Sequence, residues 1–133
     1  MVRQARSQKT RSKIIESAYA VFAQFGYEQA TLTEIAEKAD VHLQTLVRHF
    51  NTKAEIMATI HTSCTDRFEI FFLEQEGTAL ARWREWIKIR SEGAPELFGF
   101  LTDTYRFPVI TPQAQAAVNR GKELLANGIA EDM

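Results

Sequence analysis

Apolar residues recur at helical intervals along most of this chain, and no alternating run is long enough to predict a strand. The first such stretch predicts a helix that ends at Phe25, with Gly26 as the residue that terminates it. The full set of predicted helices covers residues 10–25, 32–39, 42–50, 52–74, 79–91, 95–105 and 112–129. The chain is therefore expected to be all-α, with about seven helices.

The most informative stretch lies between residues 31 and 53, where two short helices are joined by a tight turn. Thr31 and Glu34 have the spacing of a capping box, and Thr52 and Glu55 repeat it where the next helix begins. The apolar pattern breaks around Asp40 and then restarts. Two helices with a short turn between them form a helix-turn-helix unit, whose second helix enters the DNA major groove in proteins that bind DNA.

The second short helix should bury one side and present the other to solvent. Val41, Leu46 and Phe50 fall on the side expected to pack inward. The side expected to face the major groove carries His42, Leu43, Gln44, Val47 and Arg48. Glutamine pairs with adenine and arginine with guanine, while leucine and valine can contact thymine methyl groups. Phosphate contacts are expected from Thr31, Thr33, Thr45 and His49.

Charge is distributed unevenly along the 133 residues. Residues 1–53 hold eight basic and five acidic residues, a balance of +3, and the remainder hold eight and twelve, a balance of −4. This asymmetry fits a DNA reader joined to a sensor, although an ordinary solvated surface accounts for it equally well. Residues 1–10 carry Arg3, Arg6 and Lys9 and no acid, and we expect a mobile arm that either follows DNA or remains a disordered tail.

Other features of the composition narrow the class of protein. The single cysteine excludes an internal disulfide and fits a reducing, cytoplasmic location. No apolar run reaches the length of a membrane helix, and no signal-peptide pattern follows the basic N-terminus. His42 and His49 are seven residues apart, a spacing that does not suit a shared metal, so no metal or cofactor is expected. We expect no enzyme, because neither a catalytic triad nor a phosphate-binding glycine loop appears.

Residues 11–57 resemble the N-terminal domain of the TetR family of bacterial transcriptional regulators. The matching positions are an Ala-x-x-x-Phe helix ending in Phe25-Gly26-Tyr27, then Thr31, Ile35-Ala36, Ala39-x-Val41, Thr45-Leu46, His49-Phe50 and Lys53. The resemblance implies a helix-turn-helix DNA-binding domain over residues 1–51 and a helical ligand-binding domain over residues 52–133. It also implies that Lys53 contacts a DNA phosphate and that the long helix after it transmits ligand binding.

The sequence departs from the family pattern in four positions of the turn and reading helix. Asp40 stands where glycine is usual, His42 where a serine caps the helix, Gln44 where the residue is small and Val47 where a tyrosine contacts phosphate. We expect the fold to be kept and the operator preference to be unusual. The family implies a homodimer, but the chain stops short of the family's two dimerisation helices, so we expect either a truncated C-terminal domain or dimerisation through other surfaces.

Aromatic residues are concentrated in the second half of the chain. Their pattern fits either an apolar ligand pocket or a plain core, and the resemblance favours a pocket for an apolar or aromatic effector. The residues expected to line it are Cys64, Phe68, Phe71, Trp83, Trp86, Phe98, Leu101 and Tyr105. The helix over residues 79–91 is expected to direct Leu80, Trp83 and Ile87 inward.

These observations predict a DNA-binding transcriptional regulator, most simply a ligand-responsive repressor. Its expected partners are double-stranded DNA and a small effector, with no membrane. The alternative is a truncated or divergent sensor or interaction module without operator binding of its own. His42, Val47 and the short C-terminal part favour that alternative.

Overall fold

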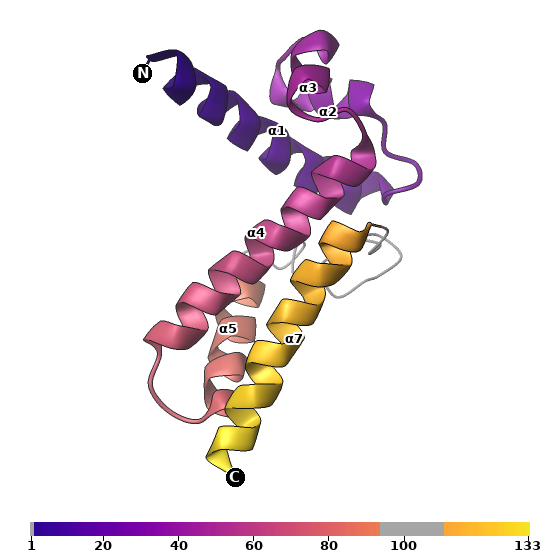
Figure 1. Ribbon diagram of the computed structural model, residues 1–133. Helices are drawn as coiled ribbons and strands as arrows, with labels where there is room; N and C mark the ends of the chain where they lie inside the picture. The colour runs from indigo at the N-terminus through magenta and orange to yellow at the C-terminus, as the bar shows by residue number, and fades with distance from the viewer. Residues whose placement is uncertain (1, 94–110) are drawn as a thin grey trace.

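The computed structural model describes residues 2–93 and 111–133, and over these residues the chain is entirely helical (Figure 1). The helices are α1 (Val2–Phe25), α2 (Leu32–Ala39), α3 (Leu43–His49), α4 (Lys53–Glu74), α5 (Ala79–Gly93) and α7 (Pro112–Asp132). The helix predicted over residues 95–105 lies outside the described residues. The all-α prediction is confirmed for the described part of the chain.

The N-terminal residues do not form the mobile arm that was expected. Residues 2–10 continue α1 without a break, so that prediction was wrong. No proline or glycine precedes Gly26, and the arginine, lysine, glutamine and alanine residues of this stretch favour helix. Nothing in the sequence therefore stops the helix from extending toward the N-terminus. Arg3, Arg6 and Lys9 are exposed along it.

Local sequence signals fix the helix ends around the predicted turn unit. Gly26 adopts a φ of 79°, and its N–H donates to the carbonyl of Phe22 at 2.8 Å, which ends α1 as predicted. Thr31 and Glu34 form both hydrogen bonds of the predicted capping box. These caps fix where α2 begins relative to α1.

The second predicted capping box forms in altered form at the start of α4. The Thr52 side chain accepts from the Glu55 N–H at 3.1 Å, as predicted. The Glu55 carboxylate, however, accepts from the N–H of Asn51 at 2.8 Å. The reciprocal bond therefore reaches one residue further back than the box requires.

Buried apolar residues form two clusters, and α4 contributes to both. The N-terminal cluster joins α1, α2 and α3 to the first turns of α4, with Phe22, Leu46, Phe50 and Ile56 among its fully or almost fully buried side chains. The C-terminal cluster is built on Phe68, Phe72 and Ala79. Figure 1 shows α4, α5 and α7 side by side, below the compact unit of the first three helices. Within the described residues, none of these helices has the length and apolar character needed to cross a membrane.

Helix α5 follows the predicted orientation only in part: Ile87 is half-buried and Trp83 lines a pocket with residues of α4 and α7. Leu80 is 46% exposed and Trp83 is 36% exposed, whereas Ala79 is fully buried. Arg82 occupies an inward position: its guanidinium lies 3.9 Å from the centre of the Phe72 ring and donates to the Phe72 carbonyl at 2.8 Å. Periodicity assigned the inward positions to apolar residues only, so it missed an arginine that packs through its guanidinium plane.

Helix α7 is tied to α4 and α5 by polar contacts and by close packing. Arg120 pairs with Asp66 and lies 3.4 Å from the Glu69 carboxylate. At the end of α7, Asp132 accepts from the N–H of Ala79 at 2.6 Å, so it caps the start of α5. These contacts join the three helices around the C-terminal cluster.

Candidate nucleic-acid interface

The turn between α2 and α3 depends on a residue in the left-handed region. Asp40 has φ 56° and ψ 47°, as predicted for a position that the sequence fills with aspartate in place of glycine. Its N–H donates to the Glu37 carbonyl at 3.1 Å, and the N–H of Val41 donates to the Ala36 carbonyl at 3.0 Å. This pair of bonds is the Schellman arrangement, which ends α2 and redirects the chain into α3.

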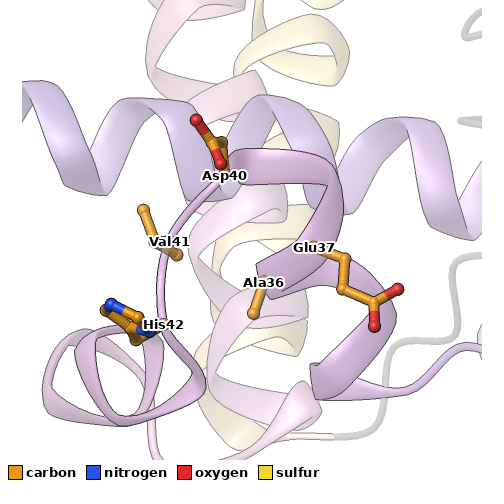
Figure 2. Close-up of a pocket in the computed structure, with 5 residues that line it drawn as sticks. All are labelled: Ala36, Glu37, Asp40, Val41 and His42. Carbon is orange, nitrogen blue, oxygen red and sulfur yellow. The ribbon is translucent and has the colours of Figure 1, made fainter.

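A pocket of about 360 Å³ lies beside this turn, lined by Ala36, Glu37, Asp40, Val41 and His42 (Figure 2). Figure 2 shows the Asp40 and Glu37 side chains pointing in different directions, so the two carboxylates do not converge. Across the described residues, no group of three His, Cys, Asp or Glu is placed to hold a metal ion. The turn thus sets the geometry of α3 through its backbone.

Helix α3 has the predicted orientation. Leu46 is fully buried and Phe50 is 2% exposed, and half-buried Val41 packs against the same cluster. The residues predicted to face the groove are all exposed: His42, Leu43, Gln44, Val47 and Arg48. On this face Leu43 is 43% exposed and Val47 is 37% exposed, and together they form an apolar strip between polar neighbours. The geometry needed for base contacts is present, while the contacts themselves stay a prediction.

The two ends of α3 are held differently. At its start, His42 provides no side-chain cap, in line with the prediction that histidine caps poorly. At its end, Arg11 of α1 lies 4.3 Å from the centre of the Phe50 ring, and its Nη1 donates to the His49 carbonyl at 3.5 Å. A cation at a helix C-terminus is electrostatically favourable. Sequence reasoning missed this brace, because it joins residues 38 positions apart.

Lys53, which the family resemblance assigns to a DNA phosphate, already has partners within the protein. Its Nζ donates to the carbonyl of Tyr27 at 2.8 Å and to that of Glu28 at 3.4 Å, and it lies 4.6 Å from the centre of the Tyr27 ring. These contacts explain why a cation is tolerated at the start of α4, against the helix dipole. Its phosphate contact stays a prediction.

The remaining predicted phosphate contacts lie near the same surface. Thr31 and Thr33 are exposed at the start of α2, and Thr45 and His49 are half-buried on α3. The hydroxyl of Thr31 donates to the Glu34 carboxylate at 2.9 Å, so its hydrogen is used by the cap. An anion at this end of α2 would therefore be met mainly by backbone N–H groups.

Some of the aromatic residues assigned to the predicted effector pocket lie close together. The Trp86 ring centre lies 5.6 Å from that of Phe68 and 5.4 Å from that of Phe71. A second pocket of about 360 Å³ is lined by Phe68, Trp83, Trp86, Val118, Gly121, Lys122 and Leu125. The prediction missed the α7 residues of this lining, because their spacing resembles that of any packed helix.

Other residues assigned to that pocket are not part of it. The Sγ of Cys64 lies 2.8 Å from the hydroxyl of Tyr19, and Cys64 packs against the N-terminal cluster and does not line this pocket. Phe98, Leu101 and Tyr105 lie outside the described residues. Cys64 was assigned from its place in the apolar stripe of α4, which continues through both clusters.

The fold and the exposed face of α3 define a helix-turn-helix protein with a further helical region attached. Residues 14–60 match the family model described as bacterial regulatory proteins of the tetR family. This N-terminal part of the chain therefore carries a domain of the tetR family.

Similar proteins agree with this assignment. The chain is 36% identical over 67 residues to the transcriptional regulator TcmR of Streptomyces glaucescens, covering 50% of this chain and 30% of that protein. It is 38% identical over 80 residues to the A-factor receptor protein of Streptomyces griseus, covering 60% of this chain and 28% of the receptor. Among solved structures, the transcriptional regulator FadR from Bacillus subtilis, in complex with stearoyl-CoA, superposes with a TM-score of 0.68 at 22% identity. That match covers 92% of this chain and 69% of FadR and shows the shared fold.

Proposed function

We propose that this chain is a DNA-binding transcriptional regulator whose helix α3 reads the major groove. The proposal rests on one observation: α3 is anchored by Leu46 and Phe50 while the face that carries Gln44 and Arg48 is exposed. Those two side chains suit adenine and guanine edges. The match to a family of bacterial regulators supports the proposal, and it favours a regulator over an enzyme. The corresponding location is the cytoplasm, where bacterial DNA lies.

We further propose a ligand-responsive repressor. The pocket beside Trp83 and Trp86 offers an apolar, aromatic surface for a small effector, and the fold is shared with a regulator solved in complex with stearoyl-CoA. The two separate hydrophobic clusters support two domains, which we assign as a reading domain over residues 1–51 and a sensing domain over residues 52–133, with the first turns of α4 packed into the N-terminal cluster. A homodimer would place two copies of α3 on adjacent half-sites about 34 Å apart.

Selection of bound duplexes from a random-sequence pool tests the reading function. We expect enrichment of one motif by the wild-type chain and by a control variant, Arg84→Ala, whose residue is exposed on α5. Gln44→Ala and Arg48→Ala should each lose base preference, at about 1–3 kcal/mol per contact. A wild-type chain that is well folded and enriches no sequence would refute operator reading.

The second candidate is a sensor or interaction module that does not read DNA. The observation in its favour is that the start of α3 lacks a side-chain cap and that the ammonium of Lys53 is held by backbone carbonyls. This candidate predicts no enriched motif together with saturable binding of an apolar probe. 1-Anilinonaphthalene-8-sulfonate is suitable, with energy transfer from Trp83 and Trp86 as the signal. Site-specific selection of DNA would eliminate this candidate.

A further inference from the structure

A groove of about 380 Å³ lies between α1 and α4, apart from the aromatic pocket and from the exposed face of α3. Figure 1 shows the two helices meeting near the end of α1 and diverging from there. Each helix contributes an arginine to the groove, Arg11 from α1 and Arg67 from α4. Ser12 and Ser63 add a hydroxyl from each side, and Glu16 is the one acid in the lining.

The guanidinium groups at this groove are poorly satisfied by the protein. Within residues 2–93 and 111–133, no carboxylate lies within ion-pair distance of Arg67, and Glu16 pairs with neither arginine. Arg11 donates one long bond, 3.5 Å, to a carbonyl. Two arginines and one glutamate leave the lining with a net charge of +1. Apart from that bond and the contact of Arg11 with the Phe50 ring, the described residues give these two guanidinium groups no other partner, so most of their N–H donors remain available.

We propose that this groove binds a small free oxyanion, the phosphate or carboxylate group of a metabolite, between Arg11 and Arg67. A guanidinium donates two parallel hydrogen bonds to a carboxylate or phosphate, and such charge-assisted bonds are about twice as strong as neutral ones. The serine hydroxyls supply further donors from both helices. A free ligand fits better than a DNA backbone, because the site is concave and Ser63 and Tyr19 in its lining are half-buried.

The same arginine connects this groove to the reading helix. Arg11 rests on the Phe50 ring and donates to the His49 carbonyl, so it braces the C-terminal end of α3. An oxyanion in the groove competes with the His49 carbonyl and the Phe50 ring for the guanidinium of Arg11. Binding should then loosen or shift the end of α3, because the helix has no side-chain cap at its other end to hold it.

Titration with inorganic phosphate at constant ionic strength, followed by amide NMR signals, tests the site directly. In the wild-type chain the Ser12 and Ser63 signals should move and saturate, and the His49 and Phe50 signals should follow with the same midpoint. Arg67→Gln should raise the half-saturating phosphate concentration roughly tenfold, the effect expected from losing one charge-assisted hydrogen bond. Arg84→Gln removes an exposed arginine elsewhere and should leave the midpoint unchanged.

The result that overturns the proposal is a linear, non-saturating shift shared by the wild-type chain and Arg67→Gln. Binding of random-sequence duplex DNA provides a second arm. If Arg67→Gln lowers the salt slope of that binding by about one while phosphate alone never saturates, the oxyanion is a DNA phosphate and the free-ligand site is refuted. An unchanged salt slope together with saturable phosphate binding supports it.

Discussion

The two ends of α4 lie in different surroundings. Its first turns enter the N-terminal cluster, which has 14 buried residues drawn from α1 to α4 and the segments between them. Its last turns enter the C-terminal cluster, where three residues are buried among the described part of the chain. Apolar burial holds the first region, whereas the second relies on a few specific contacts such as those of Arg82, Arg120 and Asp132. Among the described residues, burial is therefore concentrated in the reading unit (α1, α2, α3 and the first turns of α4), and side-chain contacts with defined partners are prominent in the helices attached to it.

The largest predicted effect tests the core of the reading unit. Leu46→Ala should lower the free energy of unfolding by about 2–5 kcal/mol, because it leaves a cavity under α3 where the side chain is fully buried. The matched control is Val47→Ala, on the exposed side of the same helix, which should change stability by no more than about 0.5 kcal/mol. Urea unfolding followed by circular dichroism measures both. Equal losses would contradict the inward orientation of Leu46.

Two glycines of α7 test how tightly the C-terminal cluster is packed. A Cβ on Gly128 would lie 2.9 Å from both the Ala79 Cβ and the Phe72 Cζ. We expect Gly128→Ala to destabilise the chain by about 1–3 kcal/mol, because the neighbouring groups must move. In thermal unfolding its midpoint should fall below that of the wild-type chain.

The control for that substitution lies two turns earlier on the same helix. A Cβ on Gly121 would meet Thr65 at 3.8 Å, an ordinary contact. Gly121→Ala should therefore stabilise the chain by up to about 1 kcal/mol through helix propensity alone. If both alanine variants raise the midpoint, the close approach of α7 to α5 described above is incorrect.

A smaller effect on stability is expected at the turn between α2 and α3, where Asp40 adopts a left-handed backbone conformation. Asp40→Gly should stabilise the chain by up to about 1 kcal/mol, because glycine adopts a φ of 56° without steric cost. Asp40→Val should destabilise it by about 1–3 kcal/mol. Chemical denaturation of the three proteins should rank glycine above aspartate above valine. Any other order would argue against the positive φ.

The smallest effect concerns pH and the N-terminal cluster. Burial, and then the charge of Glu28, hold the pKa of Tyr27 above its ordinary value of 10.0. The unfolded chain therefore loses this proton first. The raised pKa of Tyr27 therefore contributes to the free energy of unfolding. This contribution is complete below pH 10.0 and is lost as the pH rises through the pKa of Tyr27 in the folded chain.

Comparison with Tyr27→Phe isolates this contribution, because other groups titrate in the same range. The free energy of unfolding of the wild-type chain, measured from pH 8.5 to pH 11, should fall more steeply than that of the phenylalanine variant. Parallel curves would show that the phenol does not contribute to the pH dependence.

Local patterns predicted much of the N-terminal region. The capping box at Thr31, the glycine stop at Gly26 and the left-handed Asp40 all follow from spacings of a few residues, and the structure confirms them. The orientation of α3 was predictable for the same reason: burying Leu46 and Phe50 on one side of a short helix leaves a single outward face.

Contacts between distant residues were not predictable in this way. The cation of Arg11 over Phe50, that of Lys53 over Tyr27 and that of Arg82 over Phe72 each depend on tertiary placement. A periodicity argument treats such cations as solvent-facing, so it missed the inward position of Arg82 on α5 and the contacts of Arg11 and Lys53 in the N-terminal region. The early start of α1 was missed because a basic, polar stretch without core residues reads as disordered unless its helix propensity is weighed.

The helical state of residues 2–10 has a thermodynamic consequence for any polyanion that meets Arg3, Arg6 and Lys9. Restricting the backbone of one residue costs about 1–2 kcal/mol at room temperature, and a flexible tail would incur that loss on association. A segment that is already helical has lost that backbone entropy during folding. Its positive charges therefore have a fixed spacing before association, and little of the electrostatic free energy of binding is offset by ordering the chain.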